Sequence, residues 1–142
     1  MLIGEYRHSL DDKNRMRIPA KLRNQLGSDY VIMKGTNGCL FVFSQKEIEE
    51  TLNAKLKDLP LGDLQAQKSI RALFSSGYTV DEDSQGRFVL PTYLKEFANI
   101  KKNIVSVGVG NRVELWDEES WDSYNDGVNI DDVIGDLTKY GI

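Results

Sequence analysis

The chain has 142 residues, of which 40% are hydrophobic and 28% charged, so we expect one ordinary globular domain or two closely paired half-domains. Its single cysteine and single histidine exclude an internal disulfide, a cysteine-cluster metal site and a multi-histidine metal site. The net charge of −4 excludes a uniformly basic nucleic-acid binder. The sequence has neither a recognisable signal peptide nor an apolar run of the roughly 20 residues that span a membrane, so we expect a cytoplasmic protein.

The first 56 residues contain signals for two pairs of strands, each followed by a helix. The elements predicted are strands over residues 5–10 and 15–18, a helix over 19–26, strands over 30–34 and 39–43, and a helix over 45–56. Residues 11–14 are expected to join the first two strands into a tight β-hairpin, and Asn37-Gly38 marks the turn of the second hairpin. Gly27 should end the first helix, while Ser44 and Glu47 form a capping box at the start of the second.

A further helix and a second set of the same elements follow. Asp63 is expected to cap a helix that reaches Phe74. The elements predicted after it are two short strands, a helix over 91–98, strands over 104–109 and 113–116, and a short helix capped by Asp117 that carries Trp121 and Tyr124. From Asp126 the tail is acidic and only weakly patterned, so we expect it to pack on a neighbour or to fray.

The second set of elements repeats the first. At an offset of 72 residues, Tyr6, Asp11, Arg15, Pro19 and Leu22 recur as Tyr78, Asp83, Arg87, Pro91 and Leu94. These identities fall on residues that control backbone geometry, which indicates an internal duplication. Because a short hairpin–helix unit cannot bury its apolar face alone, we expect an α+β fold, mainly β, in which the two copies interlock as a pseudo-two-fold β-barrel with flanking helices. The predicted organisation is a first repeat over 1–56, a helical insert over 57–76, a second repeat over 77–125 and an acidic tail over 126–142.

Each repeat carries the motif Asp-x-x-(Asn or Gly)-Arg at its first turn. Asp11 can accept backbone N–H bonds in an Asx-type turn, and Asn14 tolerates a left-handed backbone. Asp83 and Gly86 occupy the same positions in the second repeat, where glycine suits that conformation better. The motif therefore predicts a tight turn in both copies.

Charge is distributed unevenly along the chain. Residues 1–25 carry six basic and three acidic side chains, a net of +3, whereas residues 111–142 carry two basic and nine acidic side chains, a net of −7. Since strand side chains alternate, Arg15 and Arg17 are predicted to share one face of their strand and Met16 and Ile18 the other. The asymmetry indicates either an anionic partner at the positive end or two solvated faces of opposite sign.

The sequence offers little for catalysis. A Ser–His–Asp or Cys–His pair would have to use His8, which lies in a strand pattern and is expected to be a partly buried structural residue. Cys39 is expected to be a small buried hydrophobe. Neither a GxxxxGK[ST] phosphate loop nor a GxGxxG turn that opens a helix is present. We therefore predict a protein that is not an enzyme, with no catalytic residue, metal site or cofactor.

Nucleic-acid binding is a second hypothesis. Four basic residues cluster on the predicted first hairpin: Arg7, Lys13, Arg15 and Arg17. A two-stranded β-ribbon can enter the DNA major groove, where arginine reads guanine with two hydrogen bonds. The second repeat keeps only Arg87 at the equivalent positions, so the first copy is expected to carry most of the contact. The alternative is an edge hairpin that its positive charge protects from aggregation.

A third hypothesis is an assembly module without a nucleic-acid ligand. The group of Trp116, Trp121 and Tyr124 and the apolar stripe over residues 64–74 could pack between subunits. The alternative is that the same side chains form part of the core of a single chain.

Several of these segments match a known family. They are the opening Gly4-Glu5-Tyr6-Arg7-His8, the two Asp-x-x-x-Arg motifs, the Ile18-Pro19-Ala20 step and the segment GVGNRVELW over residues 108–116. In them the chain resembles the MraZ proteins, and the similarity runs from Met1 to about Tyr124. Asn14 stands where the family commonly has glycine.

The resemblance implies a fold and a function. The fold would be a tandem of AbrB-type swapped-hairpin units in one chain. The function would be transcriptional regulation, usually repression, of the bacterial division and cell-wall gene cluster from a promoter with short direct repeats. MraZ proteins form ring-shaped homo-oligomers that place several DNA-binding hairpins along one duplex, and they associate with the nucleoid.

The resemblance also implies a role for Arg15, which is expected to contact bases or phosphates, with Asp11 shaping the loop that presents it. Charge and strand parity add Arg17, Lys13 and Arg7 as companions in DNA binding. Arg87 matches the second motif and completes the expected set, with a place in a subunit interface or an ion pair as its alternative role. The expected partners are double-stranded DNA and further copies of the chain, and we expect neither a membrane nor a small-molecule substrate.

Overall fold

The computed structural model describes all residues from Met1 to Ile142 and contains both strands and helices. The strands are β1 (Leu2–Ser9), β2 (Arg15–Met16), β3 (Tyr30–Lys34), β4 (Leu40–Ser44), β5 (Tyr78–Thr79), β6 (Phe88–Val89), β7 (Asn103–Gly110) and β8 (Val113–Asp117). The helices are α1 (Ala20–Leu26), α2 (Gln45–Glu47), the π-helical η1 (Ile48–Leu52), α3 (Asn53–Leu56), α4 (Leu64–Ser75), α5 (Thr92–Phe97), α6 (Glu118–Tyr124) and α7 (Ile130–Thr138). The predicted α+β fold, dominated by sheet, is therefore confirmed.

The strands of the two repeats are intermixed within an antiparallel six-stranded sheet. Its order is β1-β7-β8-β4-β3-β5, and β2 and β6 form a separate two-stranded ribbon. If each strand is exchanged for its counterpart in the other repeat, the sheet order reads the same in reverse. The strand pairing thus has a pseudo-two-fold relation between the repeats. Each repeat forms one hairpin by itself, β3–β4 or β7–β8, and the six-stranded sheet needs both repeats.

The hairpin predicted from residues 5–10 and 15–18 is wrong in its pairing. β1 pairs along its length with β7, from Leu2 opposite Gly110 to Ser9 opposite Asn103. β2 instead pairs with β6 of the second repeat. The turn between β1 and β2 is tight, but the two strands diverge after it. The physical reason is burial, because two strands from one repeat would leave the apolar side of each without cover, whereas exchange between repeats gives both a partner and a shared core.

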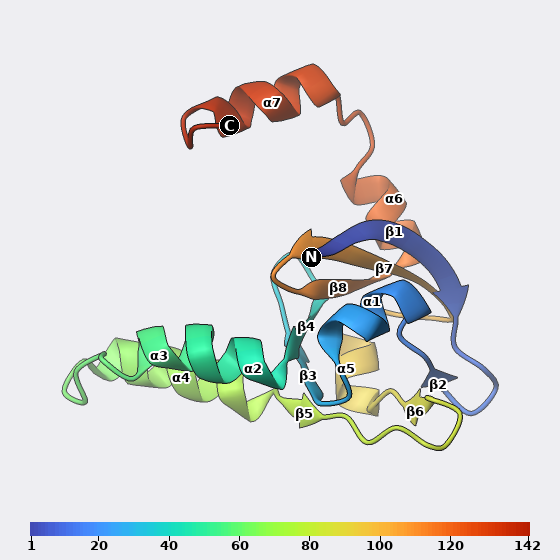
Figure 1. Cartoon of the computed structure of the whole chain (residues 1–142), viewed down its shortest axis with the longest axis horizontal. Helices are drawn as coiled ribbons and strands as arrows, with labels where there is room; N and C mark the ends of the chain where they lie inside the picture. Colours follow the sequence, from blue (N-terminus) through green and yellow to red (C-terminus); the bar gives the residue numbers. More distant parts are fainter.

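The sheet does not close into a barrel. Its edge strands, β1 and β5, are not paired with each other, and β5 contributes only two rungs to β3, Val31 opposite Thr79 and Ile32 opposite Tyr78. Helices α1 and α5 and the β2–β6 ribbon instead cover one face of the sheet (Figure 1). The predicted interlocked core is present, but helices rather than further strand pairing enclose it.

One core of 19 buried residues joins the two repeats. Leu22 of α1 and Leu94 of α5 are 1% and 0% exposed and occupy equivalent positions in the repeat. On the opposite face of the sheet, Trp116 is 4% exposed and packs edge-to-face on Trp121, with ring centroids 5.3 Å apart. The tryptophans therefore pack within a single chain, and Cys39 is fully buried as predicted.

The helix boundaries follow the predicted caps. Gly27 ends α1 with a φ of 83°, and the side chain of Ser44 accepts the N–H of Glu47 at the start of α2. Asp63 accepts the N–H of Ala66 at 3.0 Å at the start of α4. Asp117 caps α6 in the same way, through the N–H of Ser120. None of the helices is both long enough and apolar enough to cross a lipid bilayer.

Helix α7 was not predicted from the sequence, where the tail was judged to be only weakly patterned. The side chain of Asn129 accepts the N–H groups of Asp131 and Asp132 and starts the helix. Its apolar residues recur at helical spacing: Ile130, Val133, Ile134 and Leu137. This signal was short and lay within an acidic segment. In Figure 1, α7 stands away from the body of the molecule, as does the arm formed by α2, η1, α3 and α4.

Candidate nucleic-acid interface

The two Asp-x-x-(Asn or Gly)-Arg motifs fold into the same turn. One carboxylate oxygen of Asp11 accepts the backbone N–H groups of Lys13 and Arg15 at 2.8 and 2.9 Å. Its other oxygen accepts the Nε–H of Arg15 at 2.7 Å. Asp83 accepts the three corresponding N–H groups at 2.8, 2.9 and 3.1 Å, the last from Nε of Arg87. Each aspartate thus shapes its turn and holds the inner nitrogen of the arginine four residues ahead.

A left-handed residue completes each turn. The φ of Asn14 is 58° and that of Gly86 is 76°, and the N–H of each donates to the carbonyl of its aspartate at 3.0 Å. Hydrogen bonds to the carboxylates, chiefly from the backbone N–H of Arg15, lower the pKa of Asp11 to about 2. The pKa of Asp83 is lowered for the same reason. Both carboxylates are therefore ionised near neutral pH and keep their arginines bound.

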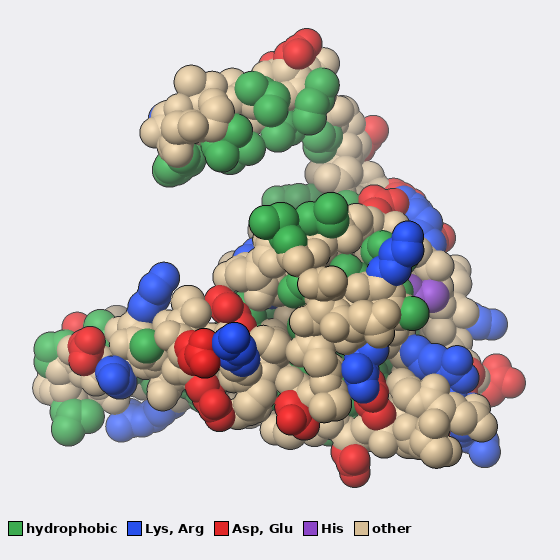
Figure 2. Space-filling model, viewed as in Figure 1, with side chains coloured by type: hydrophobic (Ala, Val, Ile, Leu, Met, Phe, Trp, Pro, Cys, Tyr) green, Lys and Arg blue, Asp and Glu red, His purple; other side chains and the backbone are tan.

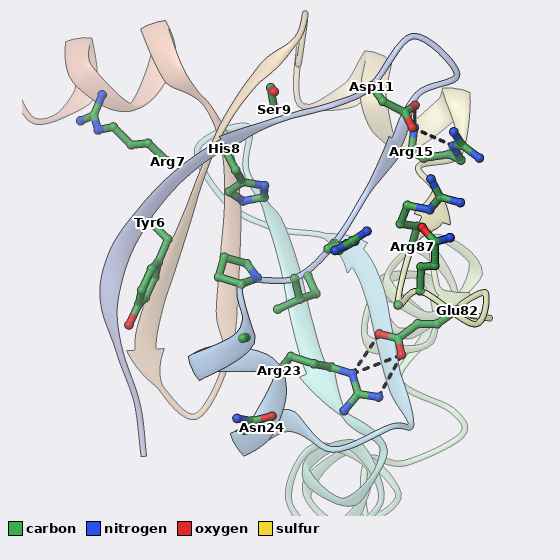
Figure 3. Close-up of a pocket in the computed structure, with 16 residues that line it drawn as sticks. Tyr6, Arg7, His8, Ser9, Asp11, Arg15, Arg23, Asn24, Glu82 and Arg87 are labelled. Atoms are coloured by element: carbon green, nitrogen blue, oxygen red, sulfur yellow. Dashed lines mark hydrogen bonds and ion pairs between the residues drawn. The ribbon is translucent and has the colours of Figure 1, made fainter.

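The β2–β6 ribbon brings both turns to one groove. Arg15 of β2 lies opposite Val89 of β6, and the N–H of Leu90 donates to the carbonyl of Asn14 at 3.0 Å. The groove beside the ribbon has a volume of about 860 Å³ and is lined by residues of both repeats. Figure 3 shows the side chains of Arg15 and Arg87 next to one another at its edge. Two arginines that are 72 positions apart in the sequence therefore share one site.

The groove is positively charged. Five arginines line it: Arg7, Arg15, Arg17, Arg23 and Arg87. The carboxylates in the lining are Asp11 and Glu82, so the formal charge is +3 when His8 is neutral. Burial lowers the pKa of His8, and its Nε2 lies 2.6 Å from the Oγ of Ser106. His8 is thus partly buried, as predicted. Figure 2 shows Lys and Arg side chains gathered around the end of the molecule that carries β2 and β6.

Arg15 and Arg17 keep nitrogen atoms free for a ligand. Met16 and Ile18 are 3% and 4% exposed, so the predicted alternation places both arginines on the side away from the core. Arg15 uses only its Nε, in the bond to Asp11, and both terminal nitrogens have no partner within the chain. The side chain of Arg17 forms no hydrogen bond or ion pair.

Lys13 and Arg7 are placed differently from these two arginines. Lys13 is exposed at the first turn and does not line the groove. The guanidinium of Arg7 reaches the groove but donates to both oxygens of Asp122, at 2.8 and 3.2 Å, and to Glu5 at 3.2 Å. These bonds, the one to Asp122 first, raise the pKa of Arg7. Arg7 is thus tied to α6, a partner that its own segment did not reveal.

Several lining residues were not singled out from the sequence, among them Arg23, Asn24 and Glu82. Arg23 of α1 donates to both carboxylate oxygens of Glu82 at 2.9 Å, and the hydroxyl of Tyr30 donates to the same carboxylate. The bond from Arg23 is the main reason that the pKa of Glu82 is lowered. The ion pair and the tyrosine hydrogen bond together join the first repeat to the segment that precedes β6. The only sequence signal was the excess of basic residues over 1–25, which included Arg23 but did not identify its partner.

The site is suited to an anionic ligand. Guanidinium groups donate paired N–H bonds to phosphate oxygens and to the acceptor edge of guanine. Cys39, by contrast, lies outside the groove, and burial raises the pKa of its thiol to about 12, which keeps it protonated. No three His, Cys, Asp or Glu side chains gather closely enough to hold a metal ion.

Comparison with known proteins identifies close relatives. The sequence matches the family model described as "MraZ protein, putative antitoxin-like" over residues 1–68 and 73–132. It is 47% identical over 143 residues to a transcriptional regulator MraZ of Clostridium botulinum (strain Eklund 17B / Type B), and 46% identical to that of Clostridium beijerinckii, with all of both chains covered in each case. The transcriptional regulator MraZ of Carboxydothermus hydrogenoformans is 42% identical over 127 residues, which cover 89% of this chain and 88% of the relative.

Proposed function

The chain belongs to the MraZ family, and from this premise we propose that it is a sequence-specific DNA-binding regulator of transcription. In this proposal it represses the bacterial gene cluster for division and cell-wall synthesis. It binds short direct repeats in the promoter as a ring of several copies, in the cytoplasm and on the nucleoid. The name shared by the relatives and the charge of the groove support this function.

The observation that carries the proposal is the set of arginines that converges on one groove from both repeats. Arg15, Arg17 and Arg87 are proposed to contact phosphates or base edges, because their terminal nitrogens are not bound by the carboxylates that hold Arg15 and Arg87 through Nε. Asp11, Asn14, Asp83 and Gly86 are proposed to set the two turns that present these arginines.

Lys13 and Arg7 take lesser parts in this proposal. Lys13 is exposed beside Asp11, where its flexible ammonium group suits a phosphate contact rather than base recognition. Arg7 is already bound by Asp122 and Glu5 and forms an ion pair with Glu118 at 3.7 Å, so a DNA phosphate would have to compete with three carboxylates. We therefore expect substitution of Arg7 to weaken DNA binding less than substitution of Arg15.

The proposal extends to the domain organisation. Strand exchange between the repeats supports two swapped-hairpin units of the AbrB type, over residues 1–56 and 77–125. Residues 57–76 would be the insert between them, and residues 126–142 the tail. The strand order, which reads the same from both edges when the repeats are exchanged, is the feature that favours this division.

Several copies are needed because one groove is a weak site. The chain has a net charge of −4, so long-range attraction to DNA comes only from the groove end of the molecule. Linking several grooves raises the effective concentration of each further contact, with a gain in overall affinity on the order of 10²–10⁴-fold. A ring whose grooves match the spacing of direct repeats would combine this gain with sequence specificity.

The test is fluorescence anisotropy on two labelled duplexes, one with the direct repeats upstream of the protein's own gene and one with their scramble. Wild type is expected to bind the repeats tightly and the affinity to fall steeply with salt, because phosphate contacts release counterions. Arg15→Ala should retain its fold by circular dichroism and lose specific binding. Arg7→Ala should lose less.

The matched control is Lys46→Ala, which removes one exposed positive charge from α2, far from the groove residues. It should bind the repeats as wild type does. Equal binding of both duplexes would favour a non-specific nucleoid protein, and no binding to either would favour a non-catalytic assembly protein. An Arg15→Ala variant that binds like wild type would overturn the assignment of the groove.

A further inference from the structure

Helix α7 carries an apolar face with nothing packed on it. Ile130, Ile134 and Leu137 are 69%, 48% and 38% exposed, and no residue of α7 is buried. Its hydrogen bonds are all within the tail itself. A helix of nine residues is too short to be stable in water without tertiary packing. The apolar face of α7 therefore needs a partner surface, and Figure 2 shows it as a row of hydrophobic side chains turned towards an open gap.

The arm of α2, η1, α3 and α4 is covered only in part. Ile48 and Leu73 pack against the buried cluster of Val31, Met33 and Phe43, whereas the tip of the arm is exposed. None of its four elements contains a buried residue, although α4 has an apolar stripe. At the far end of the arm, Leu61 and Leu64 are 85% and 79% exposed. Figure 1 shows the arm projecting to the left from the lower part of the body, with α7 separate from it above the body. The apolar face of α7 and the tip of the arm are thus two exposed helical surfaces of one chain, and each could cover apolar side chains of the other.

The charges of the two surfaces are complementary. Residues 53–75 of the arm carry four basic and two acidic side chains, a net of +2, and residues 126–142 carry four acidic and one basic, a net of −3. The exposed basic side chains within residues 53–75 are Lys55, Lys57, Lys68 and Arg71. Neither these nor the acidic side chains of the tail take part in the eight ion pairs of the chain. Two copies of α7 would repel each other, whereas α7 and the arm attract.

We propose that the apolar face of α7 of one copy packs on the far half of the arm, α3 and α4, of a second copy. The contact would form an intermolecular three-helix cluster with Ile134 and Leu137 set against Leu64, and with the tail carboxylates beside Lys68 and Arg71. The contact is heterologous, since donor and acceptor are different surfaces of the same chain. Such contacts repeat from copy to copy and close into a ring when the rotation between copies allows it.

This inference rests on the self-association that forms part of the proposed function, and it adds the two surfaces. Sedimentation velocity in the absence of DNA tests it with full-length Ile134→Glu and Leu64→Glu, both at exposed positions where the fold does not depend on the side chain. Each variant alone should raise the concentration for half-assembly at least tenfold, because a carboxylate enters an apolar contact. Circular dichroism melts should match those of wild type.

Mixing the two variants provides the decisive measurement. Ile134→Glu keeps an intact arm and Leu64→Glu keeps an intact α7, so an equimolar mixture should form a one-to-one heterodimer although neither variant assembles alone. Ile3→Glu is the matched control, because Ile3 is 64% exposed on β1 and belongs to neither surface. It should assemble like wild type.

Three outcomes would overturn the inference. Assembly of Leu64→Glu like wild type would point to contact between two α7 helices, and loss of assembly in Ile3→Glu alone would make the β1 face the acceptor. A wild type that stays monomeric would mean that α7 packs within its own chain or not at all. Binding of promoter DNA is measured separately, so a wild type that assembles through these surfaces without binding DNA would refute the proposed function and leave this inference standing.

Discussion

At the level of single residues, each turn of the groove depends on an aspartate that binds the arginine four positions ahead of it. Asp11 uses one oxygen for two backbone N–H groups and the other for the Nε of Arg15. The guanidinium is therefore oriented before any ligand arrives, and its terminal nitrogens have no partner within the chain. Preorganisation of this kind lowers the entropy lost when a phosphate or base edge binds.

The turn should lose stability when its carboxylate is removed. Asp11→Ala leaves three N–H groups without their acceptor, so we expect the melting temperature to fall by a few degrees, an effect typical of a lost capping bond. The matched control is Asp12→Ala, at an exposed neighbouring position whose side chain makes no hydrogen bond or ion pair. Differential scanning calorimetry of both variants checks this. Equal melting temperatures in the two variants would mean that the turn holds without its carboxylate.

The same bonds give this contribution a pH dependence. The pKa of Asp11 is about 2 in the folded chain, below the 3.8 of an unperturbed aspartate. A lowered pKa in the folded state stabilises it above the unfolded pKa, and this stabilisation is lost as the carboxylate becomes protonated. The difference in melting temperature between wild type and Asp11→Ala should therefore be constant above about pH 5 and shrink as the pH falls from about 4 towards 2. A difference that stays constant down to pH 2 would contradict the lowered pKa.

At the level of elements, the long pairing of β1 with β7 depends on a close approach of two backbones. Gly4 and Gly108 lie opposite each other in this ladder. A Cβ at position 108 would lie 2.4 Å from the backbone nitrogen of Ile3 and 2.5 Å from the carbonyl carbon of Leu2. No side chain fits there without displacement of β1, and β1 is the strand that leads into the Asp11 turn.

We therefore expect Gly108→Ala to destabilise the protein by about 1–3 kcal/mol, the usual cost of forcing an extra carbon into a packed site. Urea denaturation followed by circular dichroism measures the change. Gly62→Ala is the control, because no atom lies within 4 Å of a Cβ built at that position. If the two variants have the same midpoint, β1 can shift away from β7 at no cost.

At the level of the whole molecule, pairing of strands between the two repeats makes them a single cooperative unit. Most of the buried hydrophobic residues of both repeats belong to one cluster of 19, and the outer strands β1 and β5 each pair with a strand of the other repeat. Neither repeat can lose its strands without exposing the core of the other. The groove shares this dependence, because its arginines come from both repeats.

Unfolding should accordingly be a single transition, even when only one repeat is altered. Leu22 of the first repeat is 1% exposed, and Leu22→Ala is expected to cost about 2–5 kcal/mol through lost burial and a cavity. Both tryptophans lie in the second repeat, so their fluorescence reports on the half that is not altered. Fluorescence and far-UV circular dichroism should shift together in urea. A fluorescence midpoint that stays at the wild-type value would show that the repeats unfold separately.

Much of the local structure could be predicted because it depends on near neighbours. Asn37-Gly38 specified a hairpin, Asp63 began α4, and Gly27 ended α1, each through the conformation of a few adjacent residues. The repeat at an offset of 72 predicted two copies of the same elements. The geometry of the two Asp-x-x-x-Arg turns follows the same local logic, while the DNA contacts assigned to their arginines remain a prediction.

By itself, the sequence determined the family, the elements, the internal duplication and the two turns, since motif spacing and local hydrogen bonding settle these. Only the tertiary structure decided which strands pair, because the exchange of β1 and β2 into the other repeat is a choice between partners distant in the chain. That exchange set Arg87 beside Arg15, bound Arg7 to Asp122 and joined Arg23 to Glu82. Local sequence patterns do not predict such contacts, because strands of either repeat would satisfy the same hydrophobic alternation. Only burial of one common core favours pairing between the repeats over pairing within one repeat.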